Sequence, residues 1–268
     1  MKLGLPRTAF INLFFFGSLC FGGMALAGPV SRLYLTAGDQ QTWFIVQGNT
    51  VNQLPEVHAG EYALAVQNTV RTLNVTGGAG LLGNEYTLAG TPLGATYANN
   101  FGSEMIDGTT DGRFNYAVQW NFGTVVRFDL NWSSPVVVAT GLDGDTIGIT
   151  YNPSDGTFWT ASRQTSQIYH YSSTFSLLGS FATGGGPTGL AYDPADGTLW
   201  TLNQSVGNRL EQYSTGGTLL STLSSGLLAG VNTLGAEFSM VPEPTAPTLL
   251  GIGALAMLRA VRRRRNTK

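Results

Sequence analysis

One segment of the chain occurs twice, and the distance between the two copies constrains the fold more than any other feature. Residues 148–160 (GITYNPSDGTFWT) match residues 189–201 (GLAYDPADGTLWT) at an offset of 41. Further along, Tyr171 and the pair Leu177-Leu178 recur 42 residues later as Tyr213 and Leu219-Leu220. A repeat of about 40–45 residues is typical of a unit of four short β-strands.

Each copy predicts four strands joined by tight turns. The apolar first strand ends at Asn152-Pro153 or Asp193-Pro194, where proline removes a backbone donor, and the Asp-Gly pair that follows favours a hairpin turn. The later strands are predicted to begin at Phe158 or Leu199, and then to cover 168–171 or 210–213 and 177–181 or 219–223. A single unit cannot bury both of its faces, so neighbouring units must pack against each other.

Weaker copies of the second strand extend this pattern over the chain. Their marker residues are Leu33, Val70, Phe114, Phe158 and Leu199, which lie 37, 44, 44 and 41 residues apart. We therefore predict an all-β fold, a five-bladed β-propeller, with six blades as the alternative because a short first copy is easily miscounted.

The first copy lacks an innermost strand, and the end of the body supplies a spare one. Residues 232–238 (NTLGAEF) resemble residues 145–151 (DTIGITY). We expect residues 232–239 to pair beside residues 31–36, which would close the ring and remove a free sheet edge.

The N-terminus has the pattern of a signal peptide that covers residues 1–27. Lys2 and Arg7 precede an apolar stretch at 9–21, and Ala25-Leu26-Ala27 forms an A-x-A site that predicts cleavage by signal peptidase before Gly28. Cys20 lies inside this segment and is the only cysteine. The predicted mature chain therefore excludes disulfides and thiolate metal sites.

The C-terminus, residues 241–268, carries a second transport pattern. A short motif precedes 13 uncharged residues at 246–258, which are fewer than the roughly 17–25 of a comfortable membrane helix. Arginines follow, and these favour the cytoplasmic side of a membrane. The motif is Val241, Pro242, Glu243 and Pro244, and the arginines are Arg259, Arg262, Arg263, Arg264 and Arg265.

This arrangement resembles the PEP-CTERM sorting tail of exosortase substrates. The resemblance implies an exported body, a short transmembrane helix that anchors the chain transiently in the cytoplasmic membrane, and processing by an exosortase. The body at 28–240 would then reach the cell surface or the extracellular matrix.

The body is acidic. It has six arginines, no lysine and fifteen Asp or Glu residues, which gives a net charge of −9. Nucleic acids require a cationic surface, so this composition excludes them as partners.

Residues 193–200 (DPADGTLW) resemble the repeated phrase of NHL and gluconolactonase-like propellers. The gluconolactonase type implies a catalytic divalent metal held in the channel by Glu, Asn and Asp. That set has no residue-by-residue match here, and Glu61, Glu104 and Glu237 are candidates by position only.

Other polar residues suggest no catalytic group and no cofactor. His58 and His170 lack a matching nucleophile or metal motif, and we interpret both as structural. Asp143 and Asp145, and also Asp107 and Asp111, lie where loops lead into predicted inner strands, so they are candidate calcium ligands. The alternative is turn formation, which we expect of Asp155 and Asp196.

Three tryptophans, Trp43, Trp120 and Trp132, are candidates for stacking on sugar rings, although burial between blades is the alternative. Of these, we expect Trp120 to be the most exposed. The sequence thus favours an exported, non-enzymatic propeller of the cell surface or of an exopolysaccharide (biofilm) matrix, which binds a polysaccharide or protein or has a structural role. The alternative is a metal-dependent lactonase or lyase on the same ring.

Overall fold

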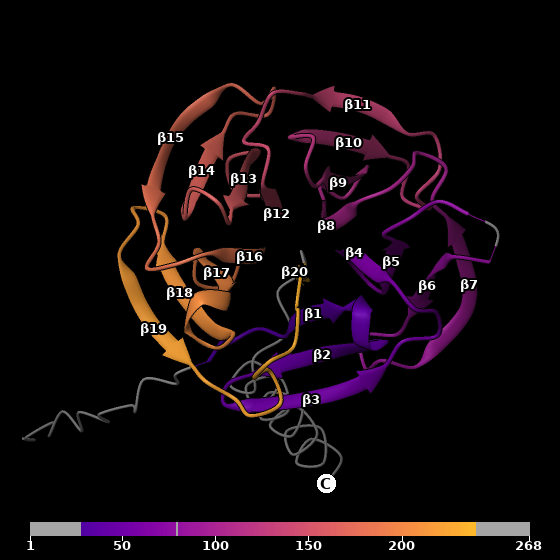
Figure 1. Cartoon of the computed structure of the whole chain (residues 1–268), viewed down its shortest axis with the longest axis horizontal. Helices are drawn as coiled ribbons and strands as arrows, with labels where there is room; N and C mark the ends of the chain where they lie inside the picture. The colour runs from indigo at the N-terminus through magenta and orange to yellow at the C-terminus, as the bar shows by residue number, and fades with distance from the viewer. Residues whose placement is uncertain (1–27, 79, 240–268) are drawn as a thin grey trace, which may run out of the picture.

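The computed structural model describes residues 28–78 and 80–239. Their strands form five four-stranded sheets around a central axis (Figure 1). The chain is a five-bladed β-propeller. The predicted blade number is confirmed and the six-bladed alternative is wrong. Within the described ranges the helices are two short 3-10 turns, η1 (Gly38–Gln40) and η2 (Gln204–Val206), and none is long and apolar enough to cross a membrane.

Each blade is antiparallel, and its strands run in order from the axis to the rim. Blade 1 contains β20 (Gly235–Phe238), β1 (Leu33–Ala37), β2 (Thr42–Gln47) and β3 (Thr50–Pro55). Blade 2 contains β4 (Glu61–Val66), β5 (Val70–Asn74), β6 (Leu82–Tyr86) and β7 (Pro92–Ala98). Blade 3 contains β8 (Met105–Thr110), β9 (Asn115–Gln119), β10 (Thr124–Phe128) and β11 (Val136–Ala139). Blade 4 contains β12 (Thr146–Asn152), β13 (Thr157–Ser162), β14 (Gln167–Tyr171) and β15 (Leu177–Ala182). Blade 5 contains β16 (Pro187–Asp193), β17 (Thr198–Asn203), β18 (Arg209–Ser214) and β19 (Leu219–Leu223).

The repeated Asp-Gly phrase forms the turn between the first two strands of blades 4 and 5, as predicted. Gly156 and Gly197 have φ values of 75° and 72°, a backbone region that favours glycine. Asp155 accepts hydrogen bonds from both the backbone and the hydroxyl of Thr157, and Asp196 does the same for Thr198. These two aspartates therefore shape turns.

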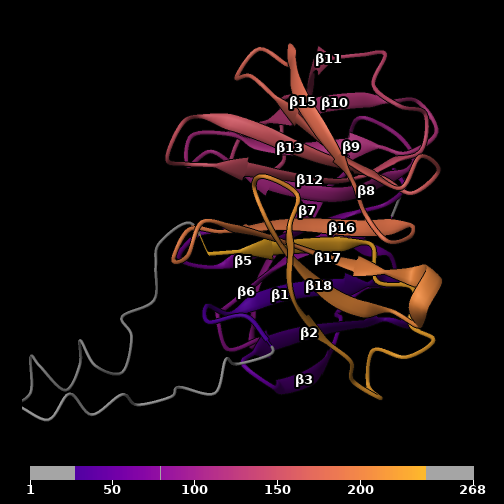
Figure 2. The ribbon, with the colours of Figure 1, turned by 90° about the vertical axis from the view of Figure 1, so that its left-hand side faces the viewer.

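The C-terminal strand closes the ring. Residues 33–36 of β1 pair with residues 235–238 of β20 in antiparallel register, which confirms the predicted closure. In Figure 2, β20 is the yellow strand directly below β16, and it also contacts β1. The strand begins at Gly235 rather than at residue 232, because Thr233 donates its N–H to the Val231 carbonyl in a tight turn. Leu234, just before the strand, still donates its N–H to the Thr36 carbonyl of β1.

The hydrophobic core is divided among the interfaces between blades. Five clusters of buried side chains each join two neighbouring blades. At the closure, for example, Phe44 and Phe238 of blade 1 pack with Trp200 and Leu210 of blade 5. Packing between successive blades, which the repeat predicted, is therefore the main source of burial.

Candidate functional site

The side chain of Asp107 lies where the inner strands converge, and the protein itself supplies all of its partners. Its Oδ1 accepts backbone N–H bonds from Gly108 (2.8 Å) and Ala236 (2.9 Å). Its Oδ2 accepts them from Ile149 (2.9 Å) and Leu190 (3.0 Å). An ionised carboxylate has about four acceptor positions, so all of them are filled. One fully buried side chain thus joins the inner strands of four blades.

Small residues at the equivalent positions allow this convergence. Asp107 aligns in register with Gly148, Gly189 and Gly235 of the other inner strands. A Cβ atom at these glycines would lie 2.6, 2.7 and 2.1 Å from a backbone oxygen of the neighbouring inner strand. The glycines therefore permit close approach between strands, and Asp107 occupies the centre that they leave.

Two residues beyond the N–H groups that bind Asp107, the inner strands have a second layer of N–H groups, and these are hydrogen bonded to side chains. Tyr151 donates its N–H to the Thr109 hydroxyl, and Tyr192 donates to the Thr150 hydroxyl, at 3.1 and 3.0 Å. In blade 1 this position is Glu237, which is 2% exposed and bonds with the Phe238 N–H and the Thr109 hydroxyl. The axis therefore contains two carboxylates surrounded by protein donors.

Burial dominates the electrostatics of this pair. It raises the pKa of the Asp107 carboxyl well above its ordinary value, and the four backbone N–H bonds oppose the shift. Burial also raises the pKa of Glu237, and the nearby negative charge of Asp107 raises it further. Since every acceptor position of Asp107 is filled, we infer that Glu237 takes up a proton first.

One end of the axis is covered by apolar side chains. Tyr62, Ile106, Ile147 and Leu234, each of which comes one residue before the Asp107 layer in the sequence, form one buried cluster. Trp120 packs on this cluster from outside. The channel at this end is therefore filled with side chains.

The other acidic candidates lie in separate places. Glu61 is buried and accepts hydrogen bonds from the His58 N–H, Thr72, Asn84 and the Tyr86 hydroxyl. Glu104 is partly exposed and contacts Asn121. Within residues 28–78 and 80–239, no three His, Asp or Glu side chains are grouped as metal ligands would be.

Asp143 and Asp145 adjoin each other in the loop before β12, as expected, and both have protein partners. Asp143 accepts hydrogen bonds from the Asp145 N–H and the Ser162 hydroxyl. Asp145 accepts two bonds from the Arg163 guanidinium, both 3.2 Å, and one from the Trp120 indole. A calcium ion would have to displace this cation. Asp111 caps the β8–β9 turn through the N–H groups of residues 113 and 114.

The rings of the two histidines contact residues other than the axis carboxylates. The ring of His58 contacts Asn84 at 2.7 Å. His170 stacks on Trp159 with ring centroids 3.9 Å apart, and its Nε2 contacts the Thr157 hydroxyl at 2.8 Å. Burial lowers the pKa of His170.

The tryptophan candidates divide into two groups. Trp43 and Trp132 are 1% and 0% exposed, so the stacking role considered for them is wrong, because both fill interfaces between blades. Trp120 is partly exposed, and Arg163 lies over its ring at 5.3 Å. The arginine therefore occupies a face that a sugar would need.

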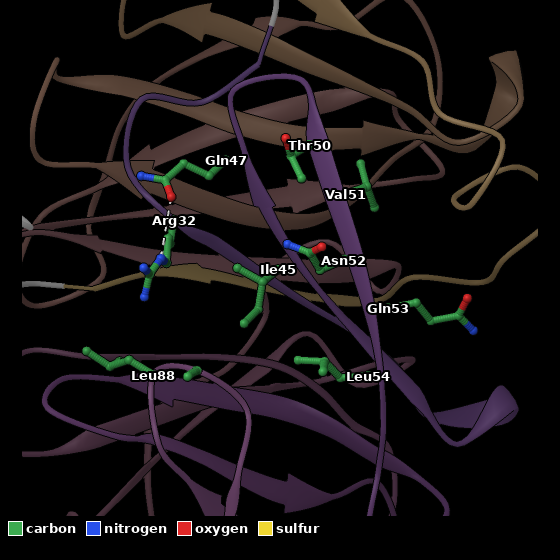
Figure 3. Close-up of a pocket in the computed structure, with 10 residues that line it drawn as sticks. Arg32, Ile45, Gln47, Thr50, Val51, Asn52, Gln53, Leu54 and Leu88 are labelled. Atoms are coloured by element: carbon green, nitrogen blue, oxygen red, sulfur yellow. Dashed lines mark hydrogen bonds between the residues drawn. The ribbon is translucent and has the colours of Figure 1, made fainter. Parts of the chain in front are cut away.

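A groove of about 610 Å³ lies on the side of the ring between blades 1 and 2 (Figure 3). One wall is the β2–β3 hairpin, where Asn52 and Ile45 are cross-strand neighbours, and the other includes Leu88 and Ala89 of the β6–β7 turn. The Tyr34 hydroxyl donates to the Leu88 carbonyl and fixes that turn. Arg32 is the one charged residue among the ten that line the groove.

Comparison with known proteins bears on the fold. No protein-family model matches the sequence, and a search of curated proteins found no match. A solved structure of a nidogen/laminin complex matches with a TM-score of 0.55 and 11% identity, over 78% of this chain and 98% of that chain. A streptogramin B lyase matches with a TM-score of 0.47 and 13% identity, over 80% of this chain and 72% of that chain. A virginiamycin B lyase from Staphylococcus aureus matches with a TM-score of 0.46 and 11% identity, over 74% of this chain and 69% of that chain. The similarity is one of fold.

Sequence reasoning missed the central position of Asp107, although a signal was present. Aligned inner strands place this aspartate in a column that is otherwise glycine or Ala63. The predicted cleavage residues Ala25 and Ala27, the sorting motif at 241–244 and the arginines at 259 and 262–265 lie outside the described residues, whereas Gly28 is the first described residue.

Proposed function

We propose that the protein is an exported propeller that serves as a binding or structural module and not as an enzyme. The filled axis supports this most directly. A channel enzyme needs polar groups with free positions for a metal or substrate, whereas the oxygens of Asp107 are saturated by four backbone N–H groups. In this proposal the central carboxylates have a structural role, because they join the inner strands to one another.

The export part of the proposal rests on the two ends of the sequence. The PEP-CTERM-like tail and the A-x-A site at 25–27 indicate transport and processing on the outer side of the cytoplasmic membrane. Mass spectrometry of the protein from its native cell tests this. A mature chain that begins at Gly28 and lacks residues 245–268 is expected, and an intact tail in the final product would exclude processing.

The groove between blades 1 and 2 is the surface that we assign to a ligand. Its amide side chains, Gln47, Asn52 and Gln53, offer donors and acceptors together, and Ile45 and Leu88 offer apolar contact. This combination suits an uncharged, hydroxyl-rich ligand such as a neutral polysaccharide.

Affinity electrophoresis in gels that contain dextran or galactomannan tests the assignment. We expect the wild-type protein to be retarded and Leu88→Asp to lose the retardation, since it places a charge on the groove wall. Leu220→Asp, the same substitution at an exposed leucine on β19, should keep it. Because Leu88 also packs on the cluster between blades 1 and 2, circular dichroism must show that Leu88→Asp retains the wild-type fold. Equal migration of all three proteins with and without polysaccharide would remove the groove from the proposal.

The alternative is a metal-dependent lactonase or lyase, and the buried acidic pair is the feature that favours it, because shifted carboxyl pKa values are frequent at active sites. An assay for divalent-metal-dependent lactone hydrolysis separates the two. We expect no turnover. Turnover that Glu237→Gln abolishes while the fold is retained would favour the enzyme.

A further inference from the structure

The outer strands of the five blades have one pairing partner each, so every blade presents a free edge at the rim (Figure 1). None of these strands contains Asp, Glu, Lys or Arg. Charged side chains on an edge strand normally discourage pairing with another chain, as do bulges. The strands are β3, β7, β11, β15 and β19.

Four of the edges are irregular. The outer strands β7, β11, β15 and β19 each show a register shift against the neighbouring strand. In contrast, all six residues of β3 pair with β2 in unbroken register, from Thr50 opposite Gln47 to Pro55 opposite Thr42. Blade 1 therefore presents the one regular, uncharged edge among the described strands.

The hairpin geometry determines which backbone groups of β3 face outward. Gln47 and Thr50 flank a two-residue loop and form the pair that closes it. Antiparallel strands alternate in the direction of their N–H and C=O groups, so those of Thr50, Asn52 and Leu54 face β2. Those of Val51 and Gln53 then face away from the blade and are available to another strand.

The sequence of β3 (TVNQLP) is compatible with pairing to a second copy of itself. Two antiparallel copies related by a two-fold axis at Asn52 place Val51 of each opposite Gln53 of the other. These are the residues whose backbone groups face outward, so each such pair exchanges two hydrogen bonds. Pro55, which has no N–H, lies beyond these pairs.

The side chains suit the same register. Asn52 lies opposite its own copy, and two amides each donate and accept. Thr50 lies opposite Leu54 of the other copy, next to the groove that both residues line. No like charges meet across the axis, although the body carries a net charge of −9.

We infer that two copies of the chain associate through β3 in antiparallel register centred on Asn52. Two four-stranded blades then form one eight-stranded sheet across the dimer, and the acidic bodies lie on either side of it. Because the long-range repulsion between these bodies is screened by ions, association strengthens as salt concentration rises. The inference rests on the fold and does not depend on export or on polysaccharide binding.

Cysteine cross-linking tests the register. The chain has one cysteine, Cys20, so the full chain with Cys20→Ser provides a background without thiols. A non-hydrogen-bonded antiparallel pair has Cα atoms about 4.5 Å apart, within the disulfide range. We expect Asn52→Cys to form a disulfide-linked dimer rapidly under mild oxidation. Gln164→Cys, on an exposed turn of blade 4, should remain mainly monomeric.

Sedimentation equilibrium tests the association itself on the thiol-free background. Asn52→Lys places two ammonium groups face to face, and we expect a rise of tenfold or more in the dimer dissociation constant. Gln164→Lys changes the net charge equally and should leave that constant within about twofold. A parent protein that stays monomeric up to roughly 100 µM at high salt would overturn the inference. Equal cross-linking of both cysteine variants, or dimers that Asn52→Lys leaves unchanged, would do the same.

Discussion

The carboxylate of Asp107 accepts a hydrogen bond of 2.9 Å from the backbone N–H of Ala236, 129 residues further along the chain. This bond connects blade 3 to the strand that closes blade 1. Because the same side chain also binds blades 4 and 5, the axis of the ring and its closure depend on each other.

Gly235→Ala should weaken the closure. The new Cβ would lie 2.1 Å from the Tyr62 carbonyl oxygen and 2.3 Å from the Thr36 hydroxyl, so β20 must shift. We expect a loss of about 3 kcal/mol in the free energy of unfolding, measured by urea denaturation. Gly144→Ala, where nothing lies within 4 Å of the new Cβ, should change it by less than about 0.5 kcal/mol. Similar effects of both substitutions would argue against close packing of β20.

Glu237→Gln should flatten the pH dependence of stability. Burial raises the pKa of Glu237 above its ordinary value of 4.5, so the folded state holds more protons than the unfolded state. The free energy of unfolding must then fall as the pH rises from about 4.5 through the raised pKa. Denaturation at pH 5 and pH 8 measures the slope. We expect a smaller difference in the variant, and an unchanged difference would show that Glu237 does not titrate in this range.

Calcium should have no effect on the loop before β12. The cation prefers six to eight oxygen ligands, whereas Asp145 is bonded to Arg163 and Asp143 to a backbone N–H and a hydroxyl. We expect no heat on titration with millimolar calcium and no change in Tm. Tight binding that Asp145→Asn removes would reverse this interpretation and restore the pair as calcium ligands.

The fold could be predicted from local signals that repeat. The Asp-Gly turns at 155–156 and 196–197 fix strand boundaries within a blade, and their spacing gives the blade count. The closure followed from the similarity of 232–238 to 145–151, since a chain that ends with a first strand and begins with a second must join them. Turns at strand ends changed the predicted boundaries by up to three residues, as at Gly235, which follows the tight turn at residues 231–233.

The site could be predicted less well, because it depends on contacts between distant segments. Asp107 precedes Gly-Thr-Thr and therefore resembles a turn residue in the sequence, and its four partners come from residues 108, 149, 190 and 236. The groove joins the β2–β3 hairpin to Leu88 of another blade. Trp132 lies between Asn131 and Ser133 in the sequence, yet neighbouring blades bury it as fully as Trp43.

The free energy of unfolding of Asp107→Asn tests most directly whether the central carboxylate holds the ring together. The amide has one acceptor oxygen and directs its N–H₂ group at two backbone donors, so two buried hydrogen bonds are lost. We predict a loss of about 3–5 kcal/mol in urea denaturation at neutral pH. Replacing a residue that serves catalysis or ligand binding often leaves the free energy of unfolding unchanged or raises it. An unchanged or increased free energy of unfolding would therefore contradict the structural role of Asp107 and favour a functional site on the axis.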